Sequence, residues 1–288
     1  MRLRVKGTTK GITKPPKTTG ILLSAIDDYL STVIAGEDRG HGWNSPSSVG
    51  GCLRNSYFSR TKVAPDFPSN DPRLQRIFDN GTGVHVRLQE YLKGNGILKE
   101  DEAPLFNPQH LIMGTTDGLL LVGDTLAVLE IKSINSYGFS ALKDAKPEHK
   151  LQASIYMYCL NEMRKSILRG DREYLEKTYL NKLTTFLKDG KKYSKEQKMQ
   201  RQFKAFCGTL DLLETYPKPL TQVLFLYENK DTQELKEFVV EDDGSISKKA
   251  LEKFDYLNKC VEEKIIPAAN RTYMCNGCKY RKVCKTIE

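Results

Sequence analysis

Two carboxylic acids and a lysine near the middle of this 288-residue sequence have the types and spacing needed for metal-dependent hydrolysis. They are Asp117, Glu130 and Lys132. Hard cations such as Mg²⁺ and Mn²⁺ take oxygen ligands, so the two carboxylates, a backbone carbonyl and waters would fill most of an octahedral shell. Lys132 could then orient or help to deprotonate a bound water. This chemistry suits a phosphodiesterase, whereas a surface salt bridge across a hairpin is the simpler alternative for the same residues.

A β-hairpin is the element that must bring these side chains together. Residues 118–122 and 125–131 are apolar and rich in Leu and Val, and the Gly-Asp pair between them tolerates positive φ values. Counting back from a two-residue turn places Asp117 opposite Glu130 on one face of the sheet. Since side chains alternate along a strand, Lys132 shares that face. The sequence therefore predicts that two carboxylates and an ammonium group converge.

Asp117 followed by Glu130-Ile131-Lys132 resembles the PD-(D/E)XK nuclease superfamily, with Thr116 in place of the pattern's proline. The resemblance implies an α/β fold with a restriction-endonuclease-like core, in which helices flank a mixed central β-sheet. It also implies a Mg²⁺- or Mn²⁺-dependent nuclease. Asp117, Glu130 and the Ile131 carbonyl would bind the metal, and Lys132 would position the attacking water. The signature is short, so three further matches must supply its specificity.

The first match is a histidine upstream of the hairpin. The apolar spacing predicts a helix that begins near Pro72 and carries His85. Residues 81–85 resemble the Gly-x-x-x-His element of the RecB-like exonuclease branch, which implies that His85 is a further metal ligand. An imidazole ligand favours Mn²⁺ somewhat over Mg²⁺. A purely structural histidine is the alternative.

The second match lies on a helix predicted to open at Pro147. Gln152 and Tyr156 are four residues apart and so share a helix face. They resemble the Gln-x-x-x-Tyr motif of the same branch, which implies contact with the nucleic-acid backbone or the terminal nucleotide. For Tyr156, burial in the core is an equally good explanation.

The third match is a set of four cysteines: Cys52, Cys275, Cys278 and Cys284. A Cys-x-x-Cys turn presents two sulfurs to one metal centre. In the iron-sulfur nucleases related to CRISPR-associated exonucleases and helicase-nuclease subunits, one N-terminal and three C-terminal cysteines hold a 4Fe-4S cluster in this order. The resemblance implies such a cluster here, with a structural role, and Arg54 two positions past the lone cysteine adds to it. A structural Zn²⁺ is the alternative, because four cysteines also bind zinc tetrahedrally.

The net charge of +9 is concentrated in one segment. Residues 164–204 hold thirteen Lys or Arg and five Asp or Glu, a balance of +8. This composition predicts a basic helical insertion that contacts nucleic acid. An ordinary solvated pair of helices is the alternative. Residues 188–192 read as an exposed turn between two helices, so Lys188, Lys191 and Lys192 are predicted to bind DNA.

The remaining sequence indicates one intracellular domain. Residues 1–20 hold six basic and no acidic residues and are predicted to form a flexible arm, followed by a single nuclease domain over residues 21–288 that ends in the cysteine segment 271–288. Seven cysteines, an odd count with four in metal-ligand spacing, favour a reducing, cytoplasmic compartment. No apolar run approaches the ~20 residues of a membrane span, so no membrane partner is expected. Further elements are predicted as helices at 21–35 and 247–264 and strands at 221–227 and 234–240.

Together these residues predict a metal-dependent DNA exonuclease that acts at single-stranded ends during replication, recombination or repair. Its partners would be DNA and other proteins of those pathways. The exonuclease mode, the single-strand preference and the choice of DNA come from the resemblance alone. Two alternatives stay open: a non-catalytic nucleic-acid-binding subunit on a nuclease-like fold, and a structure-specific endonuclease.

Overall fold

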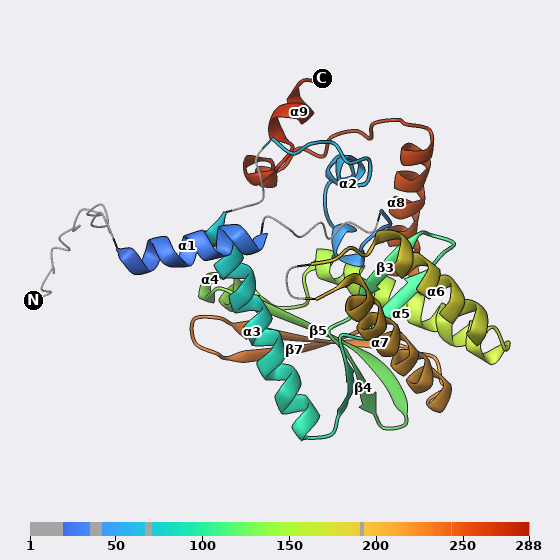
Figure 1. The fold of residues 1–288 in the computed structure, drawn as a ribbon. Coiled ribbons are helices and arrows are strands. Elements are labelled where there is room, and N and C mark those ends of the chain that lie inside the picture. The colour runs from blue at the N-terminus through green and yellow to red at the C-terminus, as the bar shows by residue number, and fades with distance from the viewer. Residues whose placement is uncertain (1–19, 35–41, 67–70, 191–192, 243, 288) are drawn as a thin grey trace, which may run out of the picture.

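The computed structural model describes residues 20–34, 42–66, 71–190, 193–242 and 244–287. Within these ranges the chain has a mixed α/β fold in which nine α-helices surround a five-stranded sheet (Figure 1). The predicted mixed sheet flanked by helices is thus confirmed.

The central sheet has the strand order β1-β4-β5-β6-β7. Strands β5 and β6 are parallel, and the other neighbours are antiparallel. A parallel pair needs a long crossover, which four helices provide here. The sheet strands are β1 (Leu98–Asp101), β4 (Gly118–Val122), β5 (Thr125–Ile134), β6 (Gln222–Asn229) and β7 (Leu235–Glu241), and β2 (Pro104–Asn107) pairs with β3 (Ile112–Thr115) in a separate hairpin. The crossover helices are α4 (Ser136–Ala141), α5 (Pro147–Leu168), α6 (Arg172–Phe186) and α7 (Lys195–Thr215).

Both faces of the sheet are covered, which explains why β5 is apolar almost throughout. Leu126 and Val128 belong to the main core, which α5 and α7 complete. Leu129 and Ile131 point the other way, into a smaller core beneath α3 (Pro72–Gly94). Because side chains alternate, Glu130 continues the α5 side of the strand. A carboxylate therefore occupies a place where the pattern calls for an apolar residue.

The remaining helices lie around this centre. Helix α1 (Ile21–Ile34) packs on α3, and α2, α8 and α9 gather at one end of the molecule (Figure 1). There, Tyr57 and Phe58 of α2 pack against Leu257 of α8 and Tyr280 near the C-terminus. The elements of this region are η1 (Pro46–Ser48), α2 (Leu53–Arg60), α8 (Ser245–Glu262), η2 (Tyr273–Gly277) and α9 (Arg281–Lys285).

The predicted elements agree closely with those of the structure. The predicted helices appear as α1, α3, α5 and α8, and the predicted strands as β4 to β7, each within a few residues of its expected bounds. The basic insertion is helical, spanning the end of α5, all of α6 and the start of α7. Most of the predicted N-terminal arm lies outside the described residues. None of the described helices has the length and apolar character needed to cross a lipid bilayer.

Gly118 begins β4 at a place with no room for a side chain. An added Cβ would lie 2.5 Å from Leu98 Cδ1 and 2.9 Å from the carbonyl oxygen of Glu100 on the neighbouring strand. We expect Gly118→Ala to lower the free energy of unfolding by ~1–3 kcal/mol, the usual cost of overpacking. It should also displace Asp117, the preceding residue. Urea unfolding followed by circular dichroism measures the stability change.

The matched control is Gly81→Ala in the middle of α3, where no atom beyond the adjoining residues and the backbone of α3 itself lies within 4 Å of the added Cβ. Alanine is the better helix former, so this variant should be stabilised by ~0.5–1 kcal/mol. A Gly118→Ala protein as stable as the wild type would contradict this expectation, because it would show that β1 moves to make room for the added methyl group.

Candidate active site

The hairpin of β4 and β5 has the register that the sequence predicts. Val122 lies opposite Thr125 and Gly118 opposite Leu129, which brings Asp117 beside the strand that carries Glu130. Asp117 is anchored by two hydrogen bonds. Its Oδ2 accepts from the backbone N–H of Ile131 at 2.6 Å, and its carbonyl oxygen accepts from Gln89 Nε2 at 2.8 Å.

Glu130 is the most unusual group of this region because its carboxylate is fully buried. Lys132 Nζ forms an ion pair with Glu130, 2.5 Å from its Oε1. Within the described residues neither Glu130 oxygen accepts a hydrogen bond. Burial and the nearby Asp117 charge raise the pKa of Glu130 to about 8, although Lys132 opposes the shift. A fully buried carboxylate whose charge is opposed only by the partly exposed Lys132 ammonium is costly for a fold to keep, and so it calls for a functional explanation.

His85 reaches the same place from α3. Its Nδ1 lies 3.2 Å from Asp117 Oδ1. Burial alone would lower the pKa of His85, but the hydrogen bond and the charge of Asp117 outweigh burial and raise it. Gln89 follows His85 by one helical turn, so one face of α3 holds both the side chain and the backbone of Asp117.

Lys132 is supported from the other side by α5. Lys132 Nζ lies 3.5 Å from Gln152 Oε1, and Gln152 Nε2 donates to the Tyr156 hydroxyl at 2.6 Å. Both α5 side chains are buried, and burial together with the charges of Glu130 and Asp117 raises the pKa of Tyr156 well above its usual value. The predicted pair thus contacts each other and faces the carboxylates. Contact of Gln152 and Tyr156 with nucleic acid stays a prediction.

Three residues of this site were missed by the sequence analysis. Gln89 could have been found from its i, i+4 spacing to His85. Tyr227 lies opposite Lys132 on the parallel strand β6, and its hydroxyl lies 2.7 Å from His149 Nδ1. Burial and the nearby Lys132 charge lower the pKa of His149 to about 4, so its ring is neutral at physiological pH. His149 also had a signal, since it precedes Gln152 by three residues on the same helix, whereas Tyr227 had none.

The donor set fits a divalent cation chemically, although the side chains are engaged with one another. Among the described residues, no group of three or more His, Cys, Asp and Glu side chains is arranged to hold a metal ion. His85 and Asp117, both predicted ligands, contact each other. The fit rests on Glu130, whose two buried oxygens accept no hydrogen bond in the part of the chain described here. Ile131 offers its N–H to Asp117, and the role of its carbonyl stays a prediction.

The four predicted cluster cysteines come from the region where α2 meets the C-terminal segment. Cys52 is the residue before α2, and Cys278 and Cys284 pack against the apolar cluster formed by α2, α8 and Tyr280. Cys275 lies in η2, where its backbone oxygen accepts from the N–H of Cys278. All four are free cysteines and are partly exposed.

Helix α2 also directs side-chain donors at two of these sulfurs. Arg54 Nη1 lies 3.5 Å from Cys284 Sγ, and Asn55 Nδ2 lies 3.4 Å from Cys278 Sγ. Nitrogen donors of this kind stabilise cysteine thiolates and tune the potential of a cluster that they hold. The donors suit thiolate ligands and do not separate iron-sulfur from zinc, although among the described residues the cysteine sulfurs are not arranged to hold a metal ion.

The basic insertion carries less free charge than its composition indicates. Arg172 on α6 forms ion pairs with Glu176 and, across the helix pair, with Asp211 and Glu214 of α7. Lys188 lies in the described part of the turn before α7, whereas Lys191 and Lys192 lie outside the described residues. The predicted DNA contacts of this turn remain predictions.

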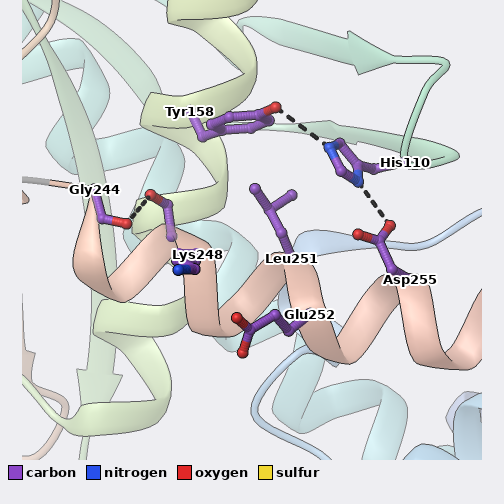
Figure 2. A pocket seen from close by; sticks show the side chains of 8 residues that line it. His110, Tyr158, Gly244, Lys248, Leu251, Glu252 and Asp255 are labelled. Atoms are coloured by element: carbon purple, nitrogen blue, oxygen red, sulfur yellow. Dashed lines mark hydrogen bonds and ion pairs between the residues drawn. The ribbon is translucent and has the colours of Figure 1, made fainter.

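A separate pocket of about 360 Å³ lies between α5 and α8, and no predicted site residue lines it (Figure 2). His110 bridges the two helices there. Its Nδ1 lies 2.6 Å from Asp255 Oδ1, and its Nε2 lies 3.3 Å from the Tyr158 hydroxyl. Figure 2 shows the three side chains in a row across the pocket. These contacts attach the β2–β3 hairpin to α5 and α8.

Comparison with known proteins gives a likeness in structure and no family. No protein-family model and no curated protein matches this chain. Among solved structures, the crystal structure of SSO0001 aligns over 92% of this chain and 96% of that chain, with a TM-score of 0.47 and 12% sequence identity. A likeness at this level carries no argument about function, which depends on the residues described above.

Proposed function

We propose that this protein is a metal-dependent deoxyribonuclease of the PD-(D/E)XK type that acts as an exonuclease at single-stranded ends. One observation carries the proposal. Glu130 is a fully buried carboxylate without a hydrogen bond among the described residues, and it adjoins Asp117, His85 and Lys132. A divalent cation held by Glu130, Asp117, His85 and the Ile131 carbonyl would satisfy these oxygens.

A bound cation would lower the pKa of water and neutralise charge on the scissile phosphate. The protein's own residues have distinct tasks. Lys132 holds and orients the attacking water, and Gln152 fixes the position of its ammonium group. Gln89 and the Ile131 N–H hold Asp117 in place, so the carboxylate is pre-positioned before substrate binds. His149 is neutral and leaves Lys132 as the local cation.

The test is digestion of end-labelled linear single-stranded DNA with Mn²⁺ or Mg²⁺, beside a circular single strand of the same sequence. We expect the linear strand to be degraded and the circle to be spared. Cleavage of the circle would make the enzyme an endonuclease. Absence of metal-dependent cleavage by protein that retains its cysteine-bound centre would leave a nucleic-acid-binding subunit.

We further propose that Cys52, Cys275, Cys278 and Cys284 bind a 4Fe-4S cluster. Protein purified without oxygen should be brown, and Cys278→Ser should lose both the iron and the broad visible absorption. Cys207→Ser is the matched control, because Cys207 lies on α7 and is not among the four. Iron and sulfide analysis with absorption spectroscopy measures both variants. A colourless wild-type protein with stoichiometric zinc would replace the cluster with a zinc site.

A further inference from the structure

A second pocket, of about 290 Å³, opens beside the end of β5. Its walls come from the first turns of α3, from the end of β5 and from the turn after β6. The lining side chains are Arg73, Arg76, Ile77, Asn80, Ser133 and Lys230. None of the six is acidic, and the volume lies just below the ~300–1,000 Å³ typical of small-ligand pockets.

The charges of this pocket suit an anion. Within the described residues, neither Arg73 nor Lys230 forms an ion pair, and both side chains are exposed. Asn80 and Ser133 add neutral hydrogen-bond donors. Arginine forks match the geometry of phosphate oxygens, and lysine adds a point charge. The set therefore suits an anion such as a phosphate group and excludes a cation.

The third cation of the pocket is already partnered. Arg76 pairs with Asp27 of α1, the helix that packs on α3. An incoming phosphate would have to compete with the Asp27 carboxylate for this guanidinium. The contact is exposed, with both side chains more than a third accessible, so exchange costs little.

Strand β5 and helix α3 contribute residues both to this pocket and to the candidate active site. Ser133 directly follows Lys132 on β5, and Asn80 precedes His85 by five residues on α3. Neighbouring strand residues point to opposite faces, so the pocket lies on the α3 side of β5 and Lys132 on the α5 side. An extended strand that passes the end of β5 could therefore reach both places.

We propose that this pocket binds a backbone phosphate of the single-stranded nucleic acid whose cleavage is proposed above. The inference rests on the proposed function for its substrate class. It assigns Arg73, Arg76 and Lys230 as phosphate-binding residues and Asp27 as the group that restrains Arg76.

The experiment is fluorescence anisotropy of a short fluorescein-labelled single-stranded oligonucleotide in EDTA, where no cleavage occurs. Arg73→Ala/Lys230→Ala should bind about tenfold or more weakly, and the slope of log K against log salt should fall by ~0.7, the contribution of one phosphate contact on a single strand. Lys248→Ala/Lys249→Ala on α8 is the control, with the same change in charge. It should bind like the wild type. Asp27→Ala should bind more tightly.

Equal weakening in the α3 and α8 double variants would overturn the inference, because binding would then follow overall charge. So would equal displacement of the oligonucleotide by a glutamate-rich peptide of matched length. Circular dichroism confirms that each variant is folded.

The nuclease proposal and the phosphate-pocket proposal can be refuted independently of each other. A wild type that binds through the pocket but never cleaves would remove the nuclease and keep the site. A wild type that cleaves, with binding and KM unchanged in Arg73→Ala/Lys230→Ala, would keep the nuclease and remove the site.

Discussion

Lys132→Ala should lower the rate of metal-dependent DNA cleavage by about 10²–10³-fold, the loss typical when one group that stabilises developing charge is removed. We expect the loss in kcat and not in KM. Lys132 is half-buried between Glu130 and Gln152, so its ammonium is not exposed to bind the DNA strand away from the scissile phosphate. Single-turnover digestion of end-labelled DNA measures it directly.

Lys150→Ala is the matched control for Lys132. Lys150 lies on α5 close to the site in sequence, but its ammonium pairs with the exposed Asp144. This variant should cleave at a rate close to that of the wild type. Gln152→Ala should show an intermediate loss, because it removes only the support of the Lys132 ammonium. A Lys132→Ala enzyme with near-normal kcat would refute the assigned role.

Glu130→Gln should abolish cleavage and yet make the metal-free protein more stable at alkaline pH. The folded protein holds the Glu130 proton up to a pKa of about 8, whereas the unfolded chain releases it near the ordinary value of 4.5. Between these values the folded state binds more protons, so the stability that this group contributes falls as pH rises and is lowest above pH 8. Glutamine stays neutral and avoids that loss.

The size of the effect follows from the shift. A change from 4.5 to about 8 sets an upper limit of roughly 5 kcal/mol, and relaxation around Lys132 should reduce the gain to ~2–3 kcal/mol above pH 8. Urea unfolding in EDTA at pH 5 and pH 9 measures it. The gain should shrink towards zero at pH 5.

Glu228→Gln is the control, for which we expect the opposite change in the free energy of unfolding. Glu228 is also buried, but Arg87 Nη2 donates to both of its oxygens at 2.7 and 2.8 Å. Losing a charge-assisted contact of this kind should destabilise the protein by ~1.5–3 kcal/mol. If Glu130→Gln behaved like Glu228→Gln at pH 9, the buried carboxylate would be satisfied after all.

The sequence was sufficient for the local geometry of the hairpin and not for its surroundings. A two-residue turn and period-two alternation determine the register that brings Asp117 to Glu130, so this part was predictable. The approach of His85 to Asp117 depends on how α3 crosses the sheet, and only the resemblance indicated it. Tyr227 joins the site because β6 pairs with β5 in parallel after a crossover of four helices. No local pattern encodes such a long-range pairing.

Charge pairing was the other feature that sequence could not provide. The balance of +8 over residues 164–204 ignores acidic partners from outside the segment, such as Asp211 and Glu214, which lie against Arg172 only once α6 and α7 have packed. The pocket beside β5 was missed for the same reason. Arg73 and Lys230 are 157 positions apart in the sequence and share a pocket only in the folded chain.

The packing of α2 against the C-terminal segment sets an order of events during synthesis. Tyr57 and Phe58 are synthesised before the central sheet, and Leu257 and Tyr280, which cover them, are synthesised after it. This apolar surface is therefore uncovered while the strands of the sheet are synthesised. A centre that needs Cys52 together with Cys275, Cys278 and Cys284 can therefore be assembled only after residue 284 has been synthesised. Truncation before Leu257 should thus expose α2 to proteolysis first.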